Sequence, residues 1–219
     1  MGIEENIKRI FEEVTKINKD VEIVAATKTR TIEEIRTCIN TGLVVAAGEN
    51  KVQELLSKYV NDFKWDFIGQ LQTNKVKYII DKVRLIQSLD RESLAQTIEK
   101  ECIKHSKIQE CLIEINSGSE ESKGGIELSE LDAYMDIFSK YDHIKIAGLM
   151  AVAPAQLTEE ELKRLFDGVY NEFSKRKNAQ FRYLSMGMSN DYLTAVKSGA
   201  NIIRPGRSII GARIYPTNI

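Results

Sequence analysis

Apolar segments alternate with amphipathic segments along this chain, and this alternation limits the folds that it can adopt. The apolar segments are typical of strands buried on both faces. They lie at residues 21–28, 43–48, 65–69, 84–88, 110–116, 144–151, 181–186 and 201–204. The segments between them have the spacing of helices, as residues 31–42, 74–83 and 159–177 show. Strict alternation of strands and helices favours a parallel sheet, because a helix supplies the crossover that parallel strands need.

Eight strand–helix units in 219 residues predict a closed (β/α)8 barrel close to the lower size limit of that α/β fold. One additional helix is expected before the first strand, at residues 3–18. A doubly wound open sheet is the alternative. No Pro- or Ser-rich linker and no low-complexity segment separates the units, so we expect a single domain over residues 1–219.

The composition of the chain argues against several classes of protein. Hydrophobic residues make up 42% and charged residues 29%, as in soluble globular domains. A net charge of −1 gives no general attraction to nucleic acid or to an anionic membrane. No apolar segment approaches the roughly 20 residues that span a bilayer, and the acidic, amphipathic N-terminus is unlike a secretory signal. We therefore expect a cytoplasmic protein without nucleic-acid or membrane partners.

The histidines and cysteines restrict the chemistry further. His105 and His143 lie in polar, charged segments, so neither a His-centred triad nor a multi-His metal site is expected. Cys38, Cys102 and Cys111 are odd in number and lack CxxC spacing, which predicts reduced, buried thiols rather than disulfides or a metal site. Neither a P-loop nor a GxGxxG motif occurs.

Functional groups of a (β/α)8 barrel lie where the strands end and the following loops begin. Polar residues or glycines occupy nearly all of these positions: Lys28, Gly48, Glu49, Asn50, Gln70, Ser88, Asp90, Asn116, Met150, Ser185 to Ser189, and Arg204. Lys28 is the most informative, because a buried strand has no structural use for an ammonium at its end. A desolvated lysine amine can attack a carbonyl. Taken alone, the segment fits a surface lysine that begins a loop equally well.

Two of the strand ends are typical of a phosphate site. In SMGMSND (185–191) a strand turns into a helix, with Ser189 predicted as the N-cap. In RPGRSIIG (204–211), Gly206 permits close backbone approach and Ser208 supplies a hydroxyl. Helix N-termini favour anions, and loops after strands seven and eight hold phosphate in many barrels. Each segment alone also fits an ordinary glycine turn.

A reactive lysine on the first strand and a phosphate cradle after the last two predict a cofactor with an aldehyde and a phosphate. Pyridoxal 5′-phosphate (PLP) has both, with Lys28 as the residue that forms the Schiff base.

Seven segments of the chain resemble, in order, the motifs of the pyridoxal phosphate homeostasis protein family, whose members are single-domain relatives of the alanine racemase barrel. The segments are AATKTR, GEN, WDFIGQLQTNK, INSGSEESKGG, AGLMA, YLSMGMSND and RPGRSIIGAR, within residues 21–213. The resemblance implies Schiff-base formation by Lys28, pocket positions near the ring for Asn50 and Asn116, phosphate-loop positions for Ser185, Gly187, Gly206 and Ser208, and an arginine facing the pyridine nitrogen at Arg204. The chain departs from the family pattern at Ala47, where an aromatic residue is common, and at Ile210, where Phe is usual.

The resemblance also bears on activity. An arginine at the pyridine nitrogen donates a hydrogen bond and leaves that nitrogen uncharged, which makes the ring a weaker electron sink. The chain ends at Ile219, soon after the eighth unit, so we expect no second domain to supply a catalytic base. Tyr183 and Tyr192 have the pattern of packing residues. The resemblance therefore favours a monomeric PLP-binding protein that balances B6 vitamers and amino acids and passes its cofactor to apo-enzymes. A PLP-dependent racemase of low activity is the alternative, and a barrel in which Lys28 is incidental is the third.

Overall fold

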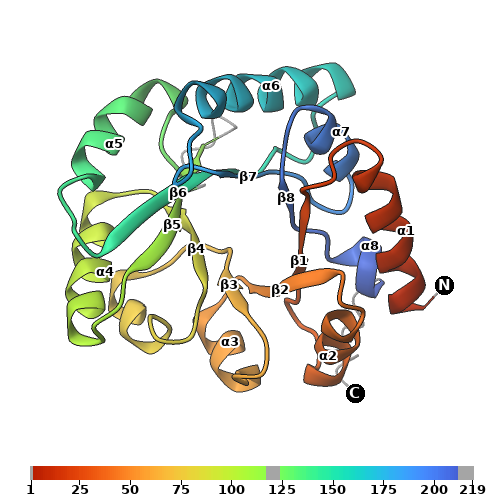
Figure 1. The fold of residues 1–219 in the computed structure, drawn as a ribbon, viewed down its shortest axis with the longest axis horizontal. Helices are drawn as coiled ribbons and strands as arrows, with labels where there is room; N and C mark the ends of the chain where they lie inside the picture. Colours follow the sequence, from red (N-terminus) through yellow and green to blue (C-terminus); the bar gives the residue numbers. More distant parts are fainter. Residues whose placement is uncertain (1, 117–123, 212–219) are drawn as a thin grey trace.

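A computed structural model of the chain describes residues 2–116 and 124–211, and its strands close into one parallel barrel (Figure 1). The strands are β1 (Glu22–Ala26), β2 (Val44–Glu49), β3 (Trp65–Phe67), β4 (Leu85–Leu89), β5 (Gln109–Ile115), β6 (Ile144–Ala151), β7 (Tyr183–Ser185) and β8 (Ile202–Ile203). The last strand pairs with the first, with Glu22 opposite Ile202 and Ile23 opposite Ile203. This pairing confirms the barrel and excludes the open sheet.

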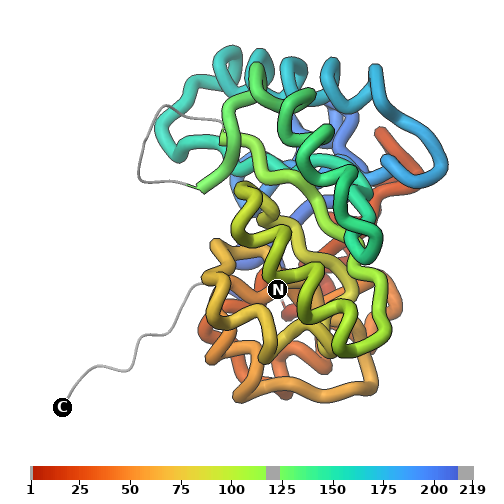
Figure 2. The backbone as a smooth tube through the Cα atoms, turned by 90° about the vertical axis from the view of Figure 1, so that its left-hand side faces the viewer, coloured from red at the N-terminus to blue at the C-terminus, as the bar shows by residue number. Residues whose placement is uncertain are grey.

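A ring of helices surrounds the barrel. The helices are α1 (Ile3–Thr15), α2 (Ile32–Asn40), α3 (Val52–Lys58), α4 (Glu92–Lys104), α5 (Leu131–Phe138), α6 (Glu159–Arg176), α7 (Tyr192–Lys197) and α8 (Arg207–Ile210). The extra N-terminal helix is confirmed as α1, which packs against α8, where the Asn6 side chain donates to the Ile209 carbonyl at 3.0 Å. The side view in Figure 2 shows α6 along the upper edge and the orange and yellow segments around α3 in the lower part.

The prediction of an α-helix at residues 74–83 is wrong. The structure has a short 3-10 helix there, η1 (Thr73–Tyr78), and a second one, η2 (Leu128–Glu130), precedes α5. Val76 and Ile79 are both buried, and the Ile79 N–H donates to the Val76 carbonyl at 3.0 Å. Ile80 and Val83 are buried as well, so the apolar spacing of this segment fits an α-helix as well as a 3-10 helix.

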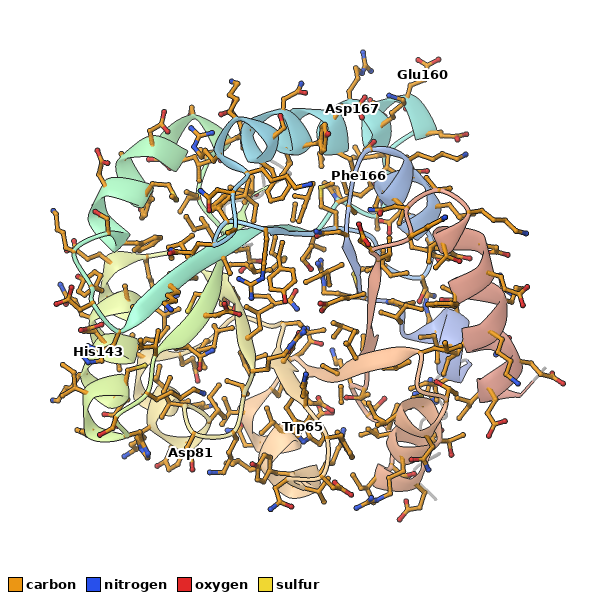
Figure 3. The ribbon with its side chains drawn as sticks, in the orientation of Figure 1. Trp65, Asp81, His143, Glu160, Phe166 and Asp167 are labelled. Atoms are coloured by element: carbon orange, nitrogen blue, oxygen red, sulfur yellow. The ribbon has the colours of Figure 1, made fainter. Side chains whose placement is uncertain are left out.

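The helices cover the strands through their apolar faces. Phe166 on α6 is fully buried and lies on the barrel side of its helix, whereas Glu160 on the same helix is exposed on the outer side (Figure 3). On β3, Trp65 is fully buried and packs beside Phe63, with ring centroids 5.1 Å apart. Its indole N–H donates to the Val60 carbonyl at 3.0 Å, so this large side chain has its polar atom satisfied.

Alternate residues of each strand point into the barrel. Val24, Leu85, Leu112 and Ile202 belong to one buried apolar cluster inside it, which also contains Ala46, Ala147 and Met150. This layer closes the barrel, so the strand ends above it form the floor of an enclosed site rather than the entrance to a pore.

Candidate functional site

Lys28 lies in a tight turn just after β1. The strand ends at Ala26, two residues earlier than the sequence pattern indicated, and the Arg30 N–H donates to the Thr27 carbonyl at 3.0 Å to close the turn. Thr29 has a φ of 64°, in the left-handed region. Lys28 is half-buried and lines a cavity at the mouth of the barrel. Its place beside a cavity favours the site interpretation over that of an incidental surface lysine.

The cavity has a volume of about 460 Å³, which is within the range of small-molecule sites. The end of β1, the loops after β1, β2, β6, β7 and β8, and the first turns of α6 and α8 supply its walls. They contribute Ala26, Lys28, Arg30, Asn50, Ala153, Pro154, Ala155, Leu157, Leu162, Met188, Ser189, Asn190, Asp191, Gly206 and Arg207. Three of the predicted site residues, Lys28, Asn50 and Gly206, therefore line the same cavity. Asn116 lies at the end of β5, where its N–H donates to the Ile126 carbonyl at 2.8 Å, and residues 117–123 of its motif lie outside the described residues.

Barrel closure brings the first and last motifs together. The Ala26 N–H donates to the Pro205 carbonyl at 3.0 Å, so the loop after β8 lies directly on the end of β1. A Cβ atom at Gly206 would lie 3.0 Å from the Ala26 carbonyl oxygen and 3.3 Å from the Ala26 Cβ. Only glycine allows this close approach without moving backbone, and the approach places Gly206 next to the turn that carries Lys28.

Ser189 joins the two loops that were predicted to hold phosphate. Its Oγ accepts hydrogen bonds from the Gly206 N–H at 3.0 Å and from the Ser208 N–H at 3.2 Å. The prediction that Ser189 caps α7 is wrong, because α7 begins at Tyr192 and Asp191 occupies the N-cap position. The Ser208 hydroxyl oxygen is buried and has no hydrogen-bond partner among the described residues. A buried hydroxyl without a partner is suited to a further polar ligand, such as an oxygen of an anion.

Gly187 allows the loop after β7 to pack closely against α7. Its φ is 95°, and a Cβ atom there would lie 2.8 Å from both the Ala195 Cβ and the Tyr192 Cα. Its carbonyl accepts from the Arg204 N–H at 2.8 Å, which ties the loop after β7 to the residue that follows β8. A side chain at this position would push the loop away from α7.

Arg204 is buried in the barrel and is not among the residues that line the cavity. It is 1% exposed, it donates through Nη1 to Ser185 Oγ, and it donates through Nη2 to the Ala151 carbonyl at 2.9 Å. Ser185 is also fully buried, and its hydroxyl donates to Gln87 Oε1 at 2.6 Å. Ser185 is therefore grouped with Arg204 in the barrel interior and not with the Ser189 and Gly206 loops, where the resemblance had placed it.

The charge of Arg204 is poorly compensated by the protein. The two acceptors described above, Ser185 and Ala151, are both neutral, and burial lowers the pKa of Arg204 to about 10, although Glu114 opposes that shift. Burial and the neighbouring Asp90 raise the pKa of Glu114 to about 7, despite the opposing effect of Arg204. Arg204 is therefore a buried cation whose carboxyl neighbour, Glu114, takes up a proton near neutral pH.

A chain of hydrogen bonds inside the barrel fixes the orientation of these groups. Gln87 Nε2 donates to Asp66 Oδ2 at 2.9 Å, and Arg84 holds both oxygens of Asp66, with Nε at 2.9 Å and Nη2 at 2.8 Å. Because the amide nitrogen of Gln87 is engaged by Asp66, its oxygen faces Ser185. The sequence pattern missed Gln87 and Asp66 because both lie within short apolar strands, away from the strand ends that were searched.

Other residues singled out in the sequence lie away from the cavity. Tyr192 donates through its hydroxyl to Glu13 Oε2 on α1 at 2.6 Å, and Tyr183 packs against the apolar cluster in the barrel. The three cysteines are buried and free, and burial raises the pKa of Cys38 to about 12 and that of Cys102 to about 11. Within residues 2–116 and 124–211, no cluster of His, Cys, Asp and Glu could hold a metal ion. The same residues include no helix that is long and apolar enough to cross a membrane.

Comparison with known proteins places this geometry in a family. The sequence model of the alanine racemase N-terminal domain matches residues 2–214. The pyridoxal phosphate homeostasis protein of Aquifex aeolicus is 39% identical over 218 residues, which cover 96% of this chain and 95% of that protein. The protein of the same name from Helicobacter pylori strain 26695 is 38% identical over 192 residues, or 85% of each chain.

Solved structures agree with the sequence comparison. PipY of Synechococcus elongatus PCC7942 with PLP bound superimposes with a TM-score of 0.80 at 27% identity, covering 92% of this chain and 100% of that one. An alanine racemase from Clostridium difficile 630, at 12% identity and a TM-score of 0.70, shares the fold and is matched over 58% of its length. On the strength of the family match and the close relatives, the chain belongs to the pyridoxal phosphate homeostasis protein family, which has the fold of the alanine racemase N-terminal domain.

Proposed function

We propose that this chain binds PLP in the cavity at the barrel mouth, with Lys28 attached covalently to the cofactor as a Schiff base. The observation that carries the proposal is the grouping of Lys28 with the Ser189 and Gly206 loops around one cavity of about 460 Å³. The PLP-bound structure of PipY, a relative of the same fold, supports it.

The residues present suit the two ends of this cofactor. The unpartnered Ser208 hydroxyl would receive the phosphate. The Gly206 and Ser208 N–H groups, which donate to Ser189 Oγ in this structure, would exchange that acceptor for a phosphate oxygen. Arg30 and Arg207, which also line the cavity, add positive charge to the same wall. Arg204 would present its remaining N–H donors to the pyridine nitrogen, since a guanidinium has five donors and no acceptor. Asn50 would bound the ring on the side of β2.

The covalent step needs no reagent beyond the two partners. Lys28 would supply the amine and PLP, when bound, would supply the aldehyde with which that amine condenses, with one water released for each C=N bond formed. No electrons are gained or lost, and the step is reversible by water. When bound, PLP would supply the reactive aldehyde, and the protein would hold it, orient it and limit its exposure to solvent.

We propose that this binding serves PLP homeostasis, in which a cytoplasmic monomer holds the reactive aldehyde and releases it to apo-enzymes, so that B6 vitamers and amino acids stay in balance. The names of the relatives in Aquifex aeolicus and Helicobacter pylori support this role. Arg204 supports it chemically, because a pyridine nitrogen that accepts a hydrogen bond from arginine stays uncharged and stabilises a carbanion poorly.

Borohydride reduction after incubation with PLP, followed by peptide mass mapping, tests the proposal. We expect one phosphopyridoxyl group, located on Lys28, and none after Lys28→Ala. Lys51→Ala is the matched control, because Lys51 is an exposed lysine beside Asn50 that does not line this cavity, and it should label like the wild type. Labelling centred on any other lysine would refute the site. Sustained exchange of an amino acid's α-proton with deuterated solvent would replace the homeostasis role with that of a racemase.

A further inference from the structure

Helix α3 holds both residues that flank Lys28. The carboxylate of Glu54, on α3, accepts the Thr29 N–H at 2.7 Å. The ammonium of Lys58, at the end of the same helix, donates to the Thr27 carbonyl at 3.1 Å and lies 3.4 Å from Glu54 Oε2. These two contacts fix the backbone on either side of Lys28, at Thr27 and Thr29. The conformation of the turn then sets the direction of the Lys28 side chain.

The turn that they hold is strained. Thr29 has a φ of 64°, a conformation that β-branched residues rarely adopt. Such a conformation persists only where the surroundings impose it, and strained residues of this kind cluster at functional sites. The hydrogen bond from the Thr29 N–H to Glu54 is the described contact that imposes it most directly.

A second acidic residue anchors the arrangement to the barrel. Glu49, the last residue of β2, is fully buried, and its Oε1 accepts from Lys58 Nζ at 2.8 Å and from the Thr27 hydroxyl at 2.7 Å. Burial raises the pKa of Glu49 despite Lys58. Burial alone would raise the pKa of Glu54, but the Thr29 N–H and Lys58 lower that pKa below its usual value. The carboxylate that holds Thr29 therefore stays charged at neutral pH.

We infer that Glu49, Glu54 and Lys58, here called the α3 clamp, are positioning residues that keep the Lys28 turn in its strained form so that the amine reaches the cofactor aldehyde. This inference rests on the proposed function, since it concerns the rate at which Lys28 reacts. The clamp lies on the β1–β2 side of the cavity and makes no described contact with the Ser189 and Gly206 loops. It should therefore act on the covalent step and not on capture of the phosphate.

The test separates these two steps. Rapid mixing with PLP gives the second-order rate constant of Schiff-base formation from the visible absorbance, and calorimetry gives the affinity for pyridoxine 5′-phosphate, which has an alcohol in place of the aldehyde. For Glu54→Ala we expect the rate constant to fall by about tenfold, because the strained turn is no longer held, with the affinity for pyridoxine 5′-phosphate unchanged. Glu54→Gln keeps an acceptor for the Thr29 N–H and should retain more of the rate.

A rescue variant and a control variant test whether Glu54 acts through the conformation of Thr29. Thr29→Gly combined with Glu54→Ala should recover most of the lost rate, because glycine adopts the left-handed conformation without steric cost. Glu5→Ala removes a similar bond, from the Gly2 N–H at 3.0 Å at the start of α1, and should change neither quantity. An unchanged rate in Glu54→Ala, an equal loss of affinity for both ligands, or no recovery in the double variant would overturn the inference. A wild-type protein that forms no adduct on Lys28 would instead overturn the proposed function.

Discussion

The buried carboxyl group of Glu114 makes the stability of the ligand-free protein depend on pH. Burial raises its pKa from 4.5 to about 7, with Asp90 adding to the shift and Arg204 opposing it. A carboxyl group whose pKa is higher in the folded state binds its proton more tightly there, so its contribution to stability is complete below pH 4.5 and is lost as pH rises through 7. The linkage relation gives a loss of stability of about 2–3 kcal/mol between pH 5 and pH 8.

The substitution Glu114→Gln removes this titration while keeping the shape of the side chain. The variant should therefore gain about 2–3 kcal/mol of stability relative to the wild type between pH 5 and pH 8, measured as the difference between their unfolding free energies in urea. Other titrating groups cancel in the comparison. Glu12→Gln, on the exposed face of α1, is the control and should show a difference that does not vary over this pH range. A pH-independent difference for Glu114→Gln as well would refute the reasoning.

Three further predictions follow from the packing around the site. Gly206→Ala should cost about 1–3 kcal/mol in unfolding free energy and weaken PLP binding, because the new Cβ meets the Ala26 carbonyl at 3.0 Å; denaturation and calorimetry would show it, and unchanged values would contradict the close approach. Gln87→Leu should destabilise the protein by about 1–3 kcal/mol, because it removes a partner of both Ser185 and Asp66; an equally stable variant would mean that these bonds contribute nothing. The three buried cysteines should react with a thiol reagent only slowly until the protein is unfolded, and rapid reaction of the native protein would show that they are accessible.

The fold could be predicted from the sequence because its signal is repetitive. Each buried parallel strand is an apolar segment and each covering helix is amphipathic, so errors in single elements do not change the count of units. Residues 74–83 show the limit of this argument. Their apolar spacing fits an α-helix as well as a 3-10 helix, and the structure has η1 (Thr73–Tyr78) instead. The short strands β3 and β8 were predicted at the right positions but with too many residues, because sequence patterns do not reveal where hydrogen bonding to a neighbouring strand ends.

The candidate site was only partly predictable, for a related reason. Lys28, Asn50 and Gly206 follow strands, and the barrel topology brings such positions to one mouth, so their grouping around one cavity could be expected. Side-chain contacts across the barrel depend on three-dimensional packing and leave no local pattern. The bond from Ser185 to Gln87 joins positions 98 residues apart in the sequence, and the hydrogen bonds that Ser189 accepts link two different loops.

The central claim is that Lys28 and the Ser189 and Gly206 loops bind the two ends of one PLP molecule, and a crystal structure after soaking with PLP tests it most directly. The account predicts continuous density from Lys28 Nζ to the cofactor, with the phosphate within hydrogen-bond distance of the Gly206 and Ser208 N–H groups. PLP bound elsewhere, or Lys28 unattached in crystals whose cavity contains the cofactor, would contradict it.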